Sequence, residues 1–523
     1  MLNFYNKYFQ NLSIHYLISI FFFSFFINYY YADLGSFPID TFLHYDSAYR
    51  ILKNEYPIQD YWVVSGIVVD FIQALFFKFF GVNWTAYKLH SSLFNAGISL
   101  FAFNYFLTLK LSHFKSLIYT ISFSILAYTV SGTPFVDHHA AFFLLLSTFL
   151  IIKIYSKKNN FILWTLAIIF ILLSFLSKQV PIIYAIFFQA TILLYFILKG
   201  ERFDLLRLII IISLSLLFTC FLFFFILKID LKLFFIEYIK YPITIGSERF
   251  KILDNSFEDL FNQFKYLIIP ICLSIFIKLH PKLKYIKIEQ DSDLKFIFIL
   301  ITALSLILHQ LLTKNQIFIY FLVPIFFAIL DSDIKNMKIK YKKYFSYILI
   351  LSIILITTKY HFRYNEERKF HEMVEINLND SIDAKIIHES LEGLKWINPS
   401  FNGKPSEEAQ IIKNAVNLLD SKDYEVMLIT HYLFIDSITK NNMNFPSRTF
   451  TTDGVSFPVV GNKNFKVYKD FLNKKIAEKK IKEIYFIKHE NISQEVFENY
   501  YAAECFKKEE NNLFLIYKIT CST

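Results

Sequence analysis

Acidic side chains gather in one polar stretch directly after the first apolar run of the chain. Asp33, Asp40, Asp46 and Asp60 lie there within 28 residues. A carboxylate held at the surface of a membrane can meet a lipid-borne substrate and take a proton from a hydroxyl group as a general base. The acids of an ordinary solvated loop are the simpler explanation for most of them. Aromatic residues, which concentrate where a membrane meets water, are interleaved with these acids: Tyr45, Tyr49, Tyr56, Tyr61 and Trp62.

A second polar turn places Asp137, His138 and His139 together at the start of an apolar run. Three interpretations are open for this trio: it binds a divalent cation, it binds a sugar, or Asp137 caps the helix that follows. Because no fourth ligand is evident in the sequence, we expect no cofactor, and a divalent cation is the weaker alternative.

The short turns 131–138, 178–180 and 313–316 between apolar runs contain few basic side chains, which makes Lys178 conspicuous. It lies with Gln179 between two apolar runs, and its ammonium group either extends to the membrane surface or neutralises a phosphate group as that group leaves a substrate. Lys240 and Arg249, in the stretch 228–265, are secondary candidates for the phosphate role. The weakest candidates are His309, Lys314 and Asn315.

The composition indicates that a membrane protein positions these residues. Of the 523 residues, 55% are hydrophobic, with 63 Phe against 11 Gly, and the mean hydropathy is +0.41. Soluble proteins are about 45–50% apolar, so a soluble enzyme, a disordered scaffold, a collagen-like fibre and a small disulfide framework are excluded. The apolar runs are continuous and lack the alternation of a barrel wall. The net charge is +10, but no nucleic-acid recognition motif accompanies it, and we expect no nucleic-acid partner.

The apolar runs predict about eleven membrane-spanning helices. The loops on one side of this arrangement hold most of the Lys and Arg, which places the N-terminus in the cytoplasm and residues 359–523 outside. The segment 67–81 is too short to span and contains Asp70 and Lys78, so we expect it to lie in the membrane interface within a first outer loop, 32–85. The predicted spans are 14–31, 86–108, 116–132, 139–152, 161–177, 181–198, 208–227, 266–279, 296–312, 317–330 and 345–358.

After residue 358 the composition becomes rich in Lys, Glu and Asn, and no spanning run follows. Strand and helix patterns alternate there, which predicts a small α/β domain. The expected fold is therefore an all-α polytopic membrane domain, 1–358, followed by an extracytoplasmic α/β domain, 359–523. The predicted elements of the second domain are helices at 406–419, 468–479 and 494–501 and strands at 425–430, 481–487 and 512–519.

Two of the four cysteines fall in the second domain. Outer compartments are oxidising, so we predict a disulfide between Cys505 and Cys521. Cys220 and Cys272 lie in apolar runs, where cysteine acts as a small apolar side chain.

Residues 40–110 resemble the start of the polytopic GT-C glycosyltransferases that use a polyprenyl-phosphate sugar, the class of the protein O-mannosyltransferases and the lipid A aminoarabinose transferases. In that pattern an Asp, usually followed by Glu, precedes an aromatic residue in the first outer loop. A short helix, a Gly/Pro/Asp stretch and an interfacial helix ending in Phe-Gly come next. Ser47 occupies the position where Glu is commoner. The matching residues are Asp46-Ser47-Ala48-Tyr49, Tyr56-Pro57-Ile58-Gln59-Asp60, Gly66 and Phe79-Phe80-Gly81.

The resemblance implies a transferase that moves a sugar from a polyprenyl-phosphate donor to a glycan, lipid or protein acceptor, with inversion at the anomeric carbon. Asp46 would be the catalytic base, with Asp40 as the weaker alternative, and Asp60 would either orient the acceptor or cap the interfacial helix. The substrate-binding candidates are Tyr49, Asp60, Asp137, His138, Lys178 and Arg249.

The expected location is the inner (plasma) membrane of a bacterium, with the lipid bilayer, the donor and the acceptor as partners. The alternative function is a transporter or flippase of lipid-linked glycans. That function would require ionisable residues along a path inside the spans, whereas the ionisable groups here concentrate at the outer ends of the runs.

Overall fold

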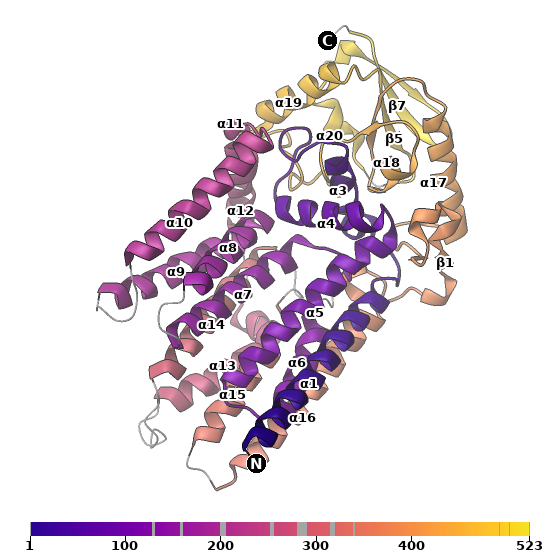
Figure 1. Cartoon of the computed structure of the whole chain (residues 1–523). Helices are drawn as coiled ribbons and strands as arrows, with labels where there is room; N and C mark the ends of the chain where they lie inside the picture. Colours follow the sequence, from indigo (N-terminus) through magenta and orange to yellow (C-terminus); the bar gives the residue numbers. More distant parts are fainter. Residues whose placement is uncertain are drawn as a thin grey trace.

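The computed structural model shows a mostly helical chain (Figure 1). Long helices form a bundle, the N-terminus lies at one end of it, and the small C-terminal domain covers the other end. Lys314 and Asn315, two weak candidates from the sequence, fall outside the part of the chain that the structure describes. The described residues are 2–127, 131–156, 161–198, 205–251, 256–279, 290–313, 319–337, 340–490, 492–501 and 503–521.

A helix forms at each apolar run because a helix satisfies its own backbone hydrogen bonds, as a chain in lipid must. These helices are α1 (Leu2–Tyr31), α5 (Trp84–Thr108), α6 (His113–Ala127), α7 (Val136–Ser156), α8 (Phe161–Ser177), α9 (Gln179–Leu198), α10 (Leu205–Cys220), α13 (Phe257–Leu279), α14 (Gln290–Thr313), α15 (Leu322–Asn336) and α16 (Lys342–His361).

Within the described residues, 5 segments are long and apolar enough to cross a membrane, and further apolar helices of 10–17 residues accompany them. This agrees with a membrane protein, and the number of about eleven spans stays a prediction. The long segments are Ile14–Tyr31, Val136–Ile154, Glu258–Leu279, Asp293–Thr313 and Lys342–His371.

The segment expected in the membrane interface forms α4 (Ile67–Phe80), which lies across the ends of the long helices beneath the C-terminal domain (Figure 1). Leu75, Phe79 and Phe80 are 54%, 75% and 56% exposed, which suits a helix resting on lipid. Asp70, on the opposite side of α4, is completely buried. The same polar stretch also contains α2 (Pro38–Thr41) and α3 (Tyr45–Leu52).

A second long connection, between α10 and α13, is also helical. It begins with a π-helical turn at Phe221–Ile226 and continues as α11 (Leu231–Phe235), a second π-helical turn at Ile236–Lys240 and α12 (Tyr241–Lys251). Gln179 ties this connection to the bundle, because its amide donates to the carbonyls of Tyr238 and Val64 at 2.7 and 2.8 Å.

The C-terminal domain contains a five-stranded sheet in the order β4-β3-β5-β7-β6. β4 and β5 pair parallel to β3, and β7 pairs antiparallel to both β5 and β6. The predicted alternation of helices and strands is present; β4 and β6 were not predicted. The bounds are α17 (Pro405–Asp420), β3 (Val426–Ile429), α18 (Ile435–Ile438), β4 (Met443–Asn444), α19 (Phe465–Glu478), β5 (Glu483–Ile487), α20 (Gln494–Glu498), β6 (Phe506–Glu510) and β7 (Phe514–Ile519), with a separate pair, β1 (Ile382–Asp383) and β2 (Lys395–Trp396).

One hydrophobic core joins this domain to the polar stretch after α1. The ring of Phe42 lies 4.7 Å from that of Phe434, and the ring of Trp62 lies 5.1 Å from that of Tyr468, measured between centroids. The backbone N–H of Trp62 also donates to the carbonyl of Pro446 at 2.9 Å. The C-terminal domain is therefore packed directly onto α2–α4, and the two parts named from the sequence share a core.

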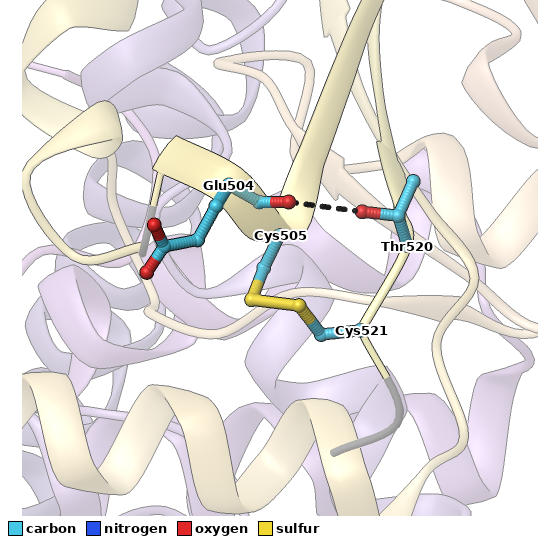
Figure 2. Close-up of a disulfide and its surroundings, with 4 residues drawn as sticks. All are labelled: Glu504, Cys505, Thr520 and Cys521. Carbon is cyan, nitrogen blue, oxygen red and sulfur yellow. Dashed lines mark hydrogen bonds between the residues drawn. A yellow bond between two sulfur atoms is a disulfide. The ribbon is translucent and has the colours of Figure 1, made fainter.

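Cys505 and Cys521, the pair predicted from the sequence, form a disulfide with their Cα atoms 4.9 Å apart (Figure 2). It joins the open end of the β6–β7 hairpin, next to a hydrogen bond from the Thr520 hydroxyl to the Glu504 carbonyl at 3.4 Å. Cys220 and Cys272 are free.

Candidate functional site

A cavity of about 320 Å³ lies where the C-terminal domain meets the helix bundle. Seven separate parts of the chain contribute its walls: α2, the segment before α4, the start of α7, the turn between α8 and α9, α12, the end of α14, and a loop of the C-terminal domain. The polar side chains that line it are Asp40, Ser65, Asp137, Lys178, Gln179, Arg249, His309, Thr313, Arg448, Thr449 and Ser456.

Asp137, Lys178 and His309 form one connected cluster in the lining of this cavity. The Lys178 ammonium donates to both carboxylate oxygens of Asp137 at 2.7 and 2.9 Å, and His309 Nε2 lies 2.5 Å from Asp137 Oδ1. Asp137 begins α7, Lys178 follows α8 and His309 is near the end of α14, so the cluster forms only when three helix ends meet. Charge-assisted bonds of this kind hold Lys178 in a fixed place.

Asp40 faces the same cavity from α2. No described residue forms a hydrogen bond or an ion pair with its carboxyl group. Burial, followed by the nearby negative charge of Asp137, raises the pKa of Asp40 to about 7, against the opposing effect of Lys178. A carboxyl group with a pKa near the working pH and no fixed partner has the properties of a general base.

Two arginines complete the lining. Arg249 projects from α12, and no carboxylate among the described residues pairs with it. Arg448 comes from the C-terminal domain, where its Nη1 lies 3.0 Å from Asp70 Oδ2 and its Nη2 donates to the carbonyl of Ser65. With Lys178 the wall carries three cationic side chains beside the paired carboxylate of Asp137, so the cavity suits an anionic group.

Asp46, the residue that the family resemblance favours as the base, does not line this cavity. Its side chain is 2% exposed and lies 4.0 Å from Arg50 Nη1 on the next turn of α3. Burial raises the pKa of Asp46 well above its usual range. Of the two acids that the sequence offers as the base, Asp40 lines the cavity and Asp46 is buried on α3 against the C-terminal domain, so the catalytic role of Asp46 stays a prediction.

Three other predicted residues also lie away from the cavity lining. Tyr49 carries the Lys53 ammonium over its ring at 4.5 Å. Asp60 accepts from the backbone N–H of Tyr56 at 2.8 Å and pairs with Lys475 of the C-terminal domain at 3.3 Å, so it fastens the two parts together. His138 is buried, with its ring 5.8 Å from that of Phe142.

The trio Asp137, His138 and His139 does not converge on one point. His139 Nε2 faces His90 Nε2 at 3.0 Å and its Nδ1 faces the carbonyl of Phe135 at 2.8 Å, whereas Asp137 bonds Lys178 and His309. Within the described residues no group of three or more His, Cys, Asp or Glu side chains is arranged to hold a metal ion.

Among the lining residues, Arg448 was missed by sequence reasoning and His309 was ranked low. Arg448 lies in a polar loop without any motif, and its partner Asp70 is 378 positions earlier in the chain. One feature of the sequence points to such a partner: Asp70 is an acid within an amphipathic helix. A carboxylate that is buried there requires a cation from another part of the chain.

A second hollow lies beside the cavity and is almost entirely apolar. This groove, of about 510 Å³, is bounded by α4, α8 and α10 with the π-helical turn that follows α10. Val68 and Leu176 line the groove, and Ser65 and Lys178, a few positions away along the same two segments, line the cavity. The other groove residues are Phe71, Ile169, Leu172, Leu173, Leu214, Ser215, Phe218, Thr219, Leu222, Phe223 and Leu227.

No protein-family model matches this chain, and no curated protein matches it. The geometry of the site therefore carries the functional argument.

Proposed function

We propose that the protein is a GT-C-type glycosyltransferase that transfers a sugar from a polyprenyl-phosphate donor to an acceptor hydroxyl at the outer face of the membrane. One observation carries this proposal: a single cavity holds the carboxyl group of Asp40, which has no hydrogen-bond or ion-pair partner among the described residues, together with the cations Lys178 and Arg249. A transferase of this class needs a base for the acceptor and positive charge for the departing phosphate.

In the proposed reaction Asp40 accepts the proton of the acceptor hydroxyl. The hydroxyl oxygen forms a bond to the anomeric carbon of the donor sugar, and the bond from that carbon to the phosphate oxygen breaks. The phosphate leaves with the bonding electron pair, and its added negative charge is stabilised by Lys178 and Arg249. A single displacement inverts the anomeric configuration.

The apolar groove supports a lipid-linked donor. A polyprenyl phosphate is an amphiphile, and its two parts require an apolar surface directly beside a cationic site. The groove and the cavity provide this pair on the segments 64–71 and 176–180. In this proposal the cavity faces outside, as the charge pattern of the loops predicts, and about eleven spans anchor it.

The proposal is tested with the purified full-length chain in nanodiscs and radiolabelled polyprenyl-phosphate sugars. Labelled sugar should appear in an acceptor glycan, lipid or protein from the native envelope, with release of unlabelled polyprenyl phosphate. Movement of the intact labelled donor across a liposome membrane, without transfer, would replace the transferase proposal with the flippase alternative.

A further inference from the structure

We infer that Arg448 of the C-terminal domain binds the phosphate group of the lipid donor, and that Asp70 is the residue that positions it. This inference rests on the proposed function and adds a role for the C-terminal domain: that domain supplies part of the donor site.

The backbone around Arg448 is bound to the first polar stretch on both sides of Trp62. The N–H of Trp62 donates to the carbonyl of Pro446 at 2.9 Å, and the N–H of Arg448 donates to the carbonyl of Trp62 at 3.1 Å. Arg50 Nη1 donates to the carbonyl of Phe445 at 2.6 Å. These three bonds fix where the Arg448 side chain leaves the C-terminal domain.

The guanidinium itself is held by a completely buried carboxylate. Asp70 Oδ2 lies 3.0 Å from Arg448 Nη1, and Asp70 Oδ1 lies 2.5 Å from His44 Nδ1. Burial lowers the pKa of His44, so the neutral imidazole donates its Nδ1 proton and leaves the Asp70 charge to Arg448. A buried carboxylate is costly without a cation, which makes Asp70 a strong anchor.

The chain leaves space for this arrangement only because residue 66 is glycine. Gly66 has φ of +80°, and a Cβ atom there would lie 2.7 Å from Arg448 Nη1 and 2.5 Å from Val136 Cγ1. Any other side chain would be strained at this φ and would push the guanidinium from its place.

Arg448 keeps donors available for a ligand. The two bonds to Asp70 and Ser65 use two of the five N–H donors of the guanidinium, and the side chain lines the cavity with Lys178 and Arg249. A planar guanidinium matches the geometry of phosphate oxygens better than an ammonium does. An arginine that only balanced Asp70 would not need to face the cavity.

The test compares binding of undecaprenyl phosphate and of uncharged undecaprenol to the full-length protein in nanodiscs. Arg448→Gln should weaken binding of the phosphate by about tenfold or more and leave binding of the alcohol unchanged. Asp70→Asn should weaken phosphate binding less, and the double variant should bind no more weakly than Arg448→Gln alone. Asp453→Asn, an exposed acid of the same loop, is the matched control and should bind like wild type.

Arg448→Lys covers the case in which Arg448→Gln does not fold, because lysine keeps the charge beside Asp70. It should bind the phosphate more weakly than wild type, since the single ammonium is already held by Asp70. Wild-type affinity in Arg448→Lys or in a folded Arg448→Gln would overturn the inference and leave the proposed function standing. A wild-type protein that does not distinguish the phosphate from the alcohol would instead contradict the proposed function itself.

Discussion

The ion pairing of acidic side chains differs between the two ends of the helix bundle. At the end distant from the C-terminal domain, the Lys115 ammonium lies 3.0 Å from Asp331 and the Lys278 ammonium lies 2.8 Å from Asp333. At the end that carries the domain, Asp137 is paired in the same way, but Asp40 has no hydrogen-bond or ion-pair partner among the described residues. Pairing of Asp331 and Asp333 stabilises helix packing at one end, whereas incomplete pairing around a cavity leaves groups free to act on a ligand.

The sharpest way to test this difference is to remove the two competing acids of the same loop. Asp40→Asn should lower turnover by about 10²–10⁴-fold, the usual contribution of general-base catalysis, while the protein stays folded. Asp46→Asn, which changes a buried acid of α3, should lower turnover far less. Turnover is measured with saturating labelled donor, and folding is checked by thermal unfolding in the same nanodiscs.

The opposite ranking would return the catalytic role to Asp46. If both variants kept near-normal turnover, the cavity would not be the catalytic site, whatever the protein transfers.

The pH dependence of the reaction tests whether Asp40 acts as the base. Burial and Asp137 raise the pKa of Asp40 to about 7, and only the ionised carboxylate can accept a proton. The value of kcat/KM should therefore fall about tenfold per pH unit below pH 7 and level off above it. This fall in kcat/KM below pH 7 should be absent from the residual activity of the Asp40→Asn variant. A profile that stays level down to about pH 4, the ordinary range of an aspartate, would contradict the assignment.

The smallest effect on catalysis is expected from a substitution at the end of the bundle distant from the C-terminal domain. Lys115→Ala leaves Asp331, which is 1% exposed, without its cation, so the free energy of unfolding should fall by about 1–3 kcal/mol. Turnover per folded molecule should not change, because the pair lies at the far end of the bundle. Unfolding in denaturant provides the measurement.

Lys342→Ala is the matched control at that end, since this exposed lysine bonds only the carbonyl of Lys335, at 3.2 Å, among the described residues. It should leave stability nearly unchanged. A large loss of turnover in Lys115→Ala would show that the two ends are coupled.

Local sequence patterns predicted the secondary structure well. Continuous apolar runs and the amphipathic segment 67–81 each became a helix. The helices and strands predicted after residue 405 are present in the predicted order, and α18, β4 and β6 occur in addition. Strand β6 escaped prediction because its sequence, Phe-Lys-Lys-Glu-Glu, is charged on both faces, as an edge strand tolerates.

The sequence by itself thus determined the helices, the small α/β domain and the cysteine pair, since periodicity, hydropathy and composition are local properties of the chain. It also restricted the candidates for the proposed general base to one short loop. Only the tertiary structure decided that Asp40 faces the cavity while Asp46 is enclosed, because the two acids lie on separate short helices, α2 and α3, whose packing sets the direction of each side chain. Only the tertiary structure brought Arg448 to Asp70. These residues lie hundreds of positions apart, so their contact depends on how the C-terminal domain packs on the bundle, and local residue spacing does not predict it.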